Sequence, residues 1–167
     1  MTQASFDSQN FRRALGRFTT GVTVVTAGGN GATPIGMTCN SFTSLSLDPP
    51  LVQWSIANSS RNYHAMCVAT HFAVHVLEAG QGEICRQFSA RDIDRFENVP
   101  LETGLHGLPL LQNYHARFEC EMYARHEAGD HTIVVGRVLR LAHKEGEPLI
   151  FYCGTLLRAV SLEPTGT

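Results

Sequence analysis

Short runs of β-branched residues, each bounded by turn-forming residues, dominate this chain and restrict the folds that it can adopt. Residues 21–27 read GVTVVTA, residues 28–31 read GGNG, and a second apolar run covers 33–42. β-Branched residues favour strands, and a glycine-rich turn between two such runs predicts a hairpin. The same criteria predict further strands over residues 51–57, 71–77, 114–126, 131–143 and 149–153.

Helical signals are few. Residues 8–17, 61–69 and 81–89 suit short helices, and Ser8 is a suitable N-cap for the first of them. These helices do not alternate regularly with the strands, which argues against a doubly wound parallel sheet. The sequence therefore predicts a mainly β fold, an antiparallel barrel or sandwich with a few short helices.

The length of the chain, 167 residues, fits a single domain over residues 1–167. Charged residues make up 17% of the sequence, against about 25% in a typical soluble domain. So few charges indicate a surface that another subunit partly covers, and we expect a homo-oligomer. The net charge of −2 provides no basic field for a nucleic-acid backbone.

The sequence contains no signal for a membrane span or for export. Its longest apolar runs, such as residues 149–153, are far shorter than the ~20 residues that a membrane helix needs. The first ten residues are polar and do not resemble a secretory signal. The five cysteines are an odd number and form no C-x-x-C motif. We therefore expect reduced thiols and a cytoplasmic location.

Residues 91–110 are rich in acidic residues, proline and glycine. The pattern predicts a long surface excursion between strands. Connections of this length are usually functional or mobile.

Three familiar motifs are incomplete. Residues 29–34 (GNGATP) lack the last glycine of G-x-G-x-x-G and lie in a predicted hairpin, which argues against a Rossmann site. Residues 126–131 (HEAGDH) are one residue too long for H-E-x-x-H and contain a turn. His71 and His75 would share one strand face, but no nearby carboxylate or thiol pair completes a ligand set. We expect no metal site.

Small polar residues border the apolar strands in three segments, 36–42, 55–62 and 86–89. Together they offer hydroxyls, amides and backbone N–H groups with few carboxylates, which suits a flat polar heterocycle with a phosphate tail. Ser59 and Ser60 could receive the phosphate at the start of the following helix. Arg61 or Arg86 could add a charge-assisted contact.

Four segments of the chain, taken in order, resemble a known family. They are residues 18–26 (FTTGVTVVT), 36–42 (GMTCNSF), 46–52 (SLDPPLV), and 129–133 (GDHTI) followed by 136–138 (GRV). The chain resembles the flavin reductase-like family over about residues 11–157. Its members are short-chain NAD(P)H:flavin oxidoreductases that serve as reductase components of two-component monooxygenases. Cys153 stands where the family frequently has arginine.

The resemblance implies an FMN-binding split β-barrel, antiparallel with Greek-key connections, that forms a homodimer with flavin near the subunit interface. It implies that the isoalloxazine ring is lined by Met37, Thr38, Cys39, Asn40 and Ser41. It places the ribityl chain and phosphate against Ser55, Ile56, Ala57, Asn58, Ser59 and Ser60. Further flavin contacts would come from Arg86, Phe88 and Ser89. His131 would lie at the nicotinamide as the catalytic residue, and Tyr152 would help to close the site.

The implied reaction is hydride transfer from the nicotinamide of NADH or NADPH to FMN or FAD, and the reduced flavin would pass to a partner monooxygenase. A cofactor that carries this chemistry needs no nucleophile or general base from the protein for the hydride step. Three alternatives stay open. They are a reductase of another acceptor such as a corrinoid or ferric chelate, a non-catalytic flavin-binding carrier or sensor, and a haem-binding split barrel.

Overall fold

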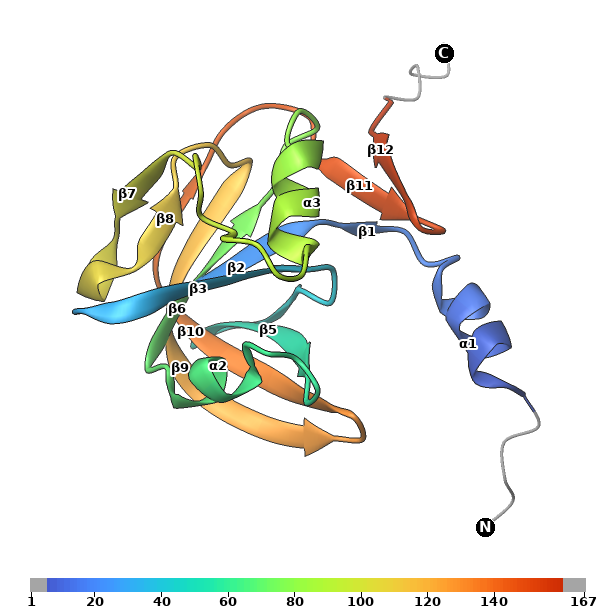
Figure 1. Cartoon of the computed structure of the whole chain (residues 1–167), viewed down its shortest axis with the longest axis horizontal. Coiled ribbons are helices and arrows are strands. Elements are labelled where there is room, and N and C mark those ends of the chain that lie inside the picture. Colours follow the sequence, from blue (N-terminus) through green and yellow to red (C-terminus); the bar gives the residue numbers. More distant parts are fainter. Residues whose placement is uncertain (1–5, 161–167) are drawn as a thin grey trace.

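The computed structural model describes residues 6–160, and its body is one strongly curled antiparallel sheet (Figure 1). β-Branched and aromatic residues on alternating positions give each strand one face for the core. In spatial order the strands are β3 (Ala32–Cys39), β2 (Thr23–Gly29), β6 (His71–Val76), β9 (Ala116–Ala128), β10 (His131–His143), β5 (Pro50–Ala57) and β4 (Thr43–Leu47). The sheet is not closed, which agrees with the split barrel that the family resemblance implies.

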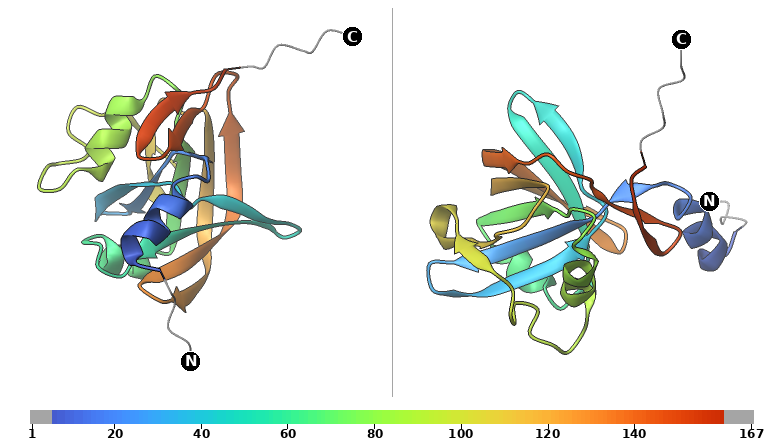
Figure 2. Two further views of the ribbon diagram at one scale, coloured as in Figure 1. Left: turned by 90° about the vertical axis from the view of Figure 1, so that its right-hand side faces the viewer. Right: turned by 90° about the horizontal axis from the view of Figure 1, so that it is seen from above.

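Smaller elements surround this sheet. Two strand groups pair separately: β1 (Thr20–Gly21), β11 (Leu149–Tyr152) and β12 (Thr155–Arg158) form one, and β7 (Leu101–Thr103) and β8 (Pro109–Leu111) the other. The helices are α1 (Ser8–Leu15), α2 (Tyr63–Val68), α3 (Gly82–Ser89) and the 3₁₀ turn η1 (Leu105–Gly107). Figures 1 and 2 show α1 standing off the sheet, beside the β11–β12 hairpin. No helix in the described part of the chain is long and apolar enough to cross a membrane.

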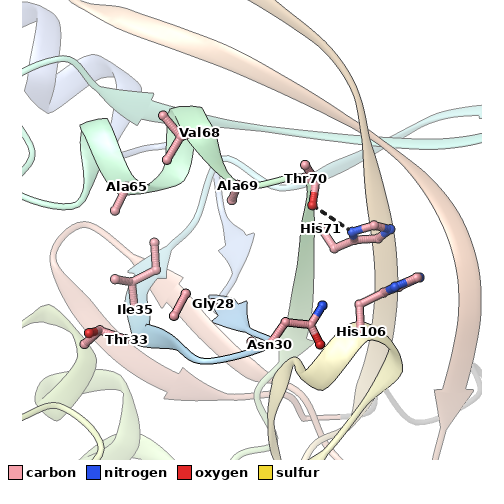
Figure 3. A pocket seen from close by; sticks show the side chains of 12 residues that line it. Gly28, Asn30, Thr33, Ile35, Ala65, Val68, Ala69, Thr70, His71 and His106 are labelled. Atoms are coloured by element: carbon pink, nitrogen blue, oxygen red, sulfur yellow. Dashed lines mark hydrogen bonds between the residues drawn. The ribbon is translucent and has the colours of Figure 1, made fainter.

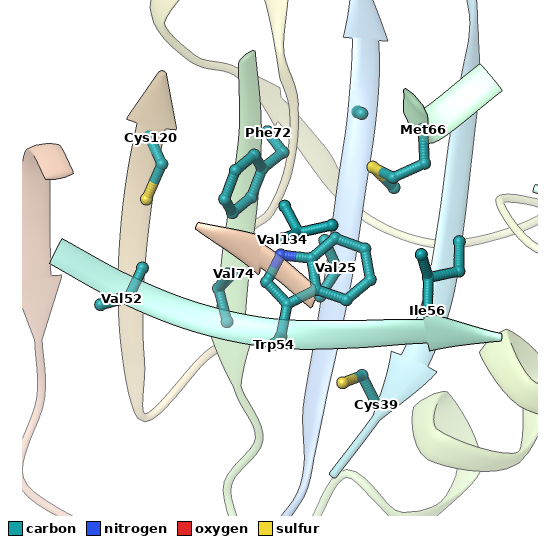
Figure 4. Close-up of a cluster of buried hydrophobic side chains, with 11 residues drawn as sticks. Val25, Cys39, Val52, Trp54, Ile56, Met66, Phe72, Val74, Cys120 and Val134 are labelled. Atoms are coloured by element: carbon teal, nitrogen blue, oxygen red, sulfur yellow. The ribbon is translucent and has the colours of Figure 1, made fainter. Parts of the chain in front are cut away.

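The core lies inside the curl of the sheet, centred on Trp54 of β5 (Figure 4). Trp54 is fully buried, and its ring meets Phe72 of β6 edge to face at a centroid distance of 5.9 Å. Val25, Met66 and Val134 pack around this pair. The buried cluster contains residues from seven elements, and this shared packing fixes the curvature of the sheet.

Most of the predicted elements are present, with three corrections. Asp7, not Ser8, caps α1, because its carboxylate accepts a hydrogen bond from Asn10 N at 2.6 Å. The strands β4 and β12, which are only five and four residues long, are not among the predicted elements. The predicted surface excursion is wrong for residues 101–111, which form β7, η1 and β8 with Leu108, Leu110 and Leu111 at most 2% exposed.

The turn expected within residues 126–131 is present between β9 and β10, and the hairpin that it joins is irregular at Gly136. The β9–β10 register shifts between Val135 and Gly136. Position 136 has no room for a side chain, because a Cβ on Gly136 would collide with the ring of Phe72. All five cysteines are free thiols, as the sequence predicts.

His75 is a buried structural group of β6 rather than a metal ligand. Its Nδ1 lies 3.1 Å from Val24 O, and its Nε2 accepts a hydrogen bond from Leu111 N at 3.1 Å. These partners require a neutral ring that donates from Nδ1. Burial lowers the pKa of His75 from 6.5 to about 4. Residues 6–160 contain no group of three or more His, Cys, Asp or Glu side chains that could hold a metal ion.

This histidine makes the stability of the fold depend on acidity. Below pH 6.5 the unfolded chain protonates His75 while the folded chain resists protonation, so stability falls as the pH drops from about 6.5 to about 4. The difference of about 2.5 pKa units corresponds to roughly 3 kcal/mol. We expect the free energies of unfolding of the wild type and His75→Gln to converge by up to about that amount over this range. Urea unfolding at several pH values measures the effect, with His64→Gln as the exposed control. A constant difference between wild type and variant would contradict it.

Candidate functional site

Three distant segments of the chain meet at the backbone of Gly36, in the middle of β3. Its carbonyl accepts hydrogen bonds from Asn62 Nδ2 at 2.9 Å and from Arg95 Nη1 at 2.8 Å. The ring of Phe88 occupies the space where a side chain would lie, because a Cβ on Gly36 would be 2.5 Å from Phe88 Cε1. We call this contact the Gly36 junction. It joins β3, the segment before α2, the loop after α3, and α3 itself.

The C-terminal end of β3 meets β5 through Ser41. Its Oγ accepts a hydrogen bond from Ser55 N at 2.9 Å and lies 3.3 Å from Ser55 O. Cys39 Sγ is 3.1 Å from the same hydroxyl. These bonds span the gap that the open sheet leaves between β3 and β5. They bring the segments 37–41 and 55–60 together, as the sequence predicts.

Alternation along β3 divides its predicted site residues between two faces. Met37 packs against the core and Cys39 is only 8% exposed. Thr38 points to the other face, where its hydroxyl donates to Cys85 O of α3 at 2.7 Å. Asn40 and Ser41 follow the strand and are exposed. The exposed donors at this end of the strand are therefore Asn40 and Ser41.

Two of the residues predicted to bind the cofactor have side chains that are buried in the core. Ile56 and Phe88 are fully buried, so only their backbone groups can meet a ligand. On α3, Arg86 and Ser89 are exposed, and the Ser89 hydroxyl donates to Arg86 O at 2.9 Å. This helix therefore offers the site one free guanidinium, at Arg86.

The segment after β5 forms a corner with the β9–β10 turn. Ala57 pairs with His131 across the sheet, and Asn58 N donates to Asp130 O at 2.9 Å. Asn58 Oδ1 accepts a hydrogen bond from Thr132 at 3.0 Å. Ser59 is exposed, and Ser60 N donates to Ala57 O to make the turn that leads into α2.

His131 lies at the rim of this corner. Its side chain is 46% exposed, and its Nδ1 is 2.7 Å from the carboxylate of Asp130. The hydrogen bond from His131 lowers the pKa of Asp130. Asp130 is therefore ionised at neutral pH and orients the ring, which leaves His131 Nε2 for a ligand.

Two cavities are lined by residues of the polar segments 36–42 and 55–62. The first, of about 200 Å³, is lined by Gly36, Asn62 and Arg95 and by Arg61, which pairs with Asp92 at 2.9 Å. The second, of about 830 Å³, lies between α1 and the strand ends and is lined by Asn40 and Ser41. Tyr152 stands beside it and accepts a hydrogen bond from Arg17 at 3.3 Å.

A third cavity, of about 390 Å³, lies beside none of the predicted polar segments (Figure 3). The rings of His71 and His106 stack there at a centroid distance of 3.8 Å. Burial, and next the charge on His106, lower the pKa of His71. The other walls of this cavity are glycines, small apolar residues and the neutral polar residues Asn30, Thr33 and Thr70, and neither arginine nor lysine is among its lining residues.

The groups around the first two cavities fit a flavin nucleotide. Asn40 and Ser41 at the second cavity, with Asn58 and Ser59 on the turn before Arg61, present neutral amides and hydroxyls, which match the polar edge of a flavin ring and a ribityl chain. Arg61 and Arg95 bring cations for a phosphate to the first cavity, which Asp92 and Asp94 also line. The sequence reveals these donors, but it does not single out Asn62 or Arg95, whose role at Gly36 depends on long-range contacts.

The bare backbone of Gly36 generates a stability prediction. We expect Gly36→Ala to lower the free energy of unfolding by about 1–3 kcal/mol, because the Phe88 ring must move to admit a methyl group. Gly80→Ala is the matched control, since a Cβ there meets no atom within 4 Å. Urea unfolding of both variants measures the difference. Equal effects at the two positions would contradict the account of the junction.

Comparison with known proteins places the chain in a family. Residues 15–159 match the family model described as flavin reductase like domain. The FMN reductase (NADH) SmoA of Agrobacterium fabrum is 53% identical over 152 residues, which cover 91% of this chain and 86% of the relative. Reductase subunit HsaB of a flavin-dependent monooxygenase from Rhodococcus jostii is 37% identical over 98% of this chain and 82% of the subunit.

A solved structure shares the fold. The NADH:FAD oxidoreductase SgcE6 of Streptomyces globisporus C-1027, in complex with NAD and FAD fragments, superposes with a TM-score of 0.89 at 39% identity. The match covers 95% of this chain and 96% of that chain. Two relatives from Rhizobium meliloti are longer, and the chain spans 44% and 58% of their lengths. By these matches and by its fold, the chain belongs to the flavin reductase-like domain family.

Proposed function

We propose that the protein is an NAD(P)H-dependent flavin reductase that delivers reduced FMN or FAD to a partner monooxygenase. The observation that carries this proposal is the position of β3 and the residues after it between two cavities. Gly36 lines the smaller cavity, and Asn40 and Ser41 line the larger one. Asn40 comes four residues after Gly36, which corresponds to about 13 Å of extended chain. A flavin lying along β3 can therefore place its ring and its phosphate at opposite ends.

In this arrangement Asn40 and Ser41 face the isoalloxazine ring, and Ser59, Ser60 and Arg61 hold the phosphate. The bond from Ser55 N fixes the Ser41 hydroxyl, so this donor is oriented before the ligand arrives. The bound flavin supplies the hydride-accepting chemistry, with a nicotinamide as the donor. The task of the protein residues is to align the two rings.

His131 is proposed to position the nicotinamide. Asp130 accepts a hydrogen bond from its Nδ1, which holds the ring in one tautomer and one orientation. Nε2 can then contact the carboxamide or the ring of the nucleotide. This role requires no proton transfer, because hydride moves between the two cofactors.

The proposal also covers the oxygenase that receives the reduced flavin and the compartment in which the protein works. The relative HsaB is named as a reductase subunit of a flavin-dependent monooxygenase, and a protein of this type passes reduced flavin to a separate oxygenase. Five free thiols suit a reducing compartment, and we infer a cytoplasmic enzyme.

The proposed homodimer rests on an exposed apolar patch. Leu139 and Leu141 lie two residues apart on β10, and the pairing of Arg137 with Leu51 places them next to the β4–β5 turn. Leu47 at that turn is 95% exposed, and Figure 2 shows the β4–β5 hairpin projecting from the body. A monomer exposes few such groups together. We infer that a second copy covers this patch.

Steady-state oxidation of NADH and NADPH, with FMN or FAD added, tests the activity. We expect turnover that requires flavin, and we expect His131→Ala to lower kcat/KM for the nucleotide about tenfold while the KM for flavin is unchanged. His143→Ala, at the other end of the same strand, is the control. Nucleotide kinetics that do not change in His131→Ala would remove this residue from the site. If flavin binds but no turnover occurs, the protein is a flavin-binding carrier or sensor. If turnover occurs only with a corrinoid or a ferric chelate, the protein is a reductase of that acceptor.

The mass of the protein in solution tests the dimer. We expect light scattering to give about twice the mass of the 18.3 kDa chain for the wild type and a monomer for Leu139→Glu/Leu141→Glu, because two charges cannot be buried in an apolar interface. Leu157→Glu on β12, where the side chain is 42% exposed, is the matched control. A monomeric wild type, or a dimeric double variant, would contradict the proposed interface.

A further inference from the structure

The larger cavity beside Asn40 and Ser41 is basic on one side. Arg12, Arg13 and Arg17 line it, and neither aspartate nor glutamate is among the lining residues. Within residues 6–160 none of these three guanidiniums forms an ion pair. Three cations that share one cavity without a carboxylate repel one another and favour an anionic ligand.

The remaining walls of this cavity are apolar and aromatic. Leu15, Phe18 and Phe151 line it, and Leu15 and Phe18 are 58% and 77% exposed. Apolar walls with a few polar groups are typical of small-molecule sites. At about 830 Å³ the cavity is in the size range of such sites. Flat walls beside guanidiniums suit a ligand in which a ring adjoins phosphate groups.

We propose that Arg12, Arg13 and Arg17 form a subsite for the pyrophosphate of a dinucleotide substrate, beside the ring-binding end of β3. This inference rests on the proposed function, because it identifies the pyrophosphate as the group by which the reductase site selects a dinucleotide. Arg12 and Arg13 come from the last turn of α1, and Arg17 follows that helix. The subsite determines the preference for dinucleotides over mononucleotides.

The position of the cluster separates it from the flavin phosphate. Arg61 lies at the smaller cavity with Gly36, whereas the cluster lies at the larger cavity with Asn40, about 13 Å farther along β3. One mononucleotide whose ring lies at Asn40 cannot place its only phosphate at both. The cluster therefore serves a second phosphate group, either in NADH or in the adenylate half of FAD.

Compensation of the helix dipole does not explain the cluster. Cations in the last turn of a helix do stabilise its free carbonyls. In α1, however, Gly16 N already donates to Arg12 O and Ala14 O. Arg17 lies beyond the helix and donates to Tyr152 OH at 3.3 Å, which holds it at the cavity. The hydrogen-bond partner of this third guanidinium is therefore Tyr152 rather than a carbonyl of the helix.

Binding of ADP-ribose to the protein without flavin tests the proposal directly, because this ligand has the pyrophosphate but neither nicotinamide nor flavin. Calorimetry should give a Kd at least about tenfold weaker for Arg12→Gln/Arg13→Gln and for Arg17→Gln, since each loses charge-assisted contacts. Adenosine, which lacks phosphate, should bind equally to all variants. Arg158→Gln, an exposed residue at the far end of the β11–β12 hairpin, is the control. Circular dichroism confirms that each variant is folded.

Kinetics then identify the dinucleotide. A higher KM for NADH with FMN as acceptor, and an unchanged KM for reduced nicotinamide mononucleotide, assign the subsite to the nicotinamide nucleotide. If reduced nicotinamide mononucleotide is the donor and the variants raise the KM for FAD but not for FMN, the subsite belongs to FAD. Wild-type protein that does not bind ADP-ribose, or variants that bind it unchanged, would overturn the subsite while leaving flavin turnover intact. Absence of all flavin turnover, with ADP-ribose still bound by the cluster, would instead overturn the proposed function.

Discussion

The packing of the Phe88 ring against the bare backbone of Gly36 is the contact on which the site depends. A side chain at Gly36 would collide with that ring, so α3 can lie flat on β3 only because the position is glycine. The free Gly36 carbonyl then binds Asn62 and Arg95, which fixes the segment before α2 and the loop after α3. Sites built on such rigid elements hold ligand groups in one geometry before binding.

This junction also explains why the fold uses an open sheet. β3 is an edge strand, and edge strands leave backbone groups that need partners or cover. Here α3 covers one part of the strand through the bond from Thr38 to Cys85 O, and Ser41 ties its end to β5. Gly36 of this strand lines the smaller cavity, and Asn40 and Ser41, which follow the strand, line the larger one. A closed barrel would remove the edge and, with it, the surface along which a nucleotide can lie.

The sequence predicts the sheet, the short helices and the polar segments, because these depend on local alternation and turn chemistry. It does not predict that Leu108, Leu110 and Leu111 are buried, since the surrounding glycine and proline residues resemble a surface loop. Asn62 lies in the predicted polar segment 55–62, but neither its bond to Gly36 O nor that of Arg95 can be predicted, because the carbonyl belongs to a residue far away in the chain. Ile56 and Phe88 were expected at the cofactor, and their full burial limits them to backbone contacts. Long-range packing decided each of these differences.

A crystal structure of the protein with FMN is the most direct test of this account. The account predicts the isoalloxazine ring at Asn40 and Ser41 and the phosphate within hydrogen-bond distance of Ser59, Ser60 or Arg61. It also predicts that the Gly36 carbonyl keeps both of its bonds when the ligand is present. Flavin bound instead in the cavity of His71 and His106, or with its phosphate at Arg12 and Arg13, would contradict it.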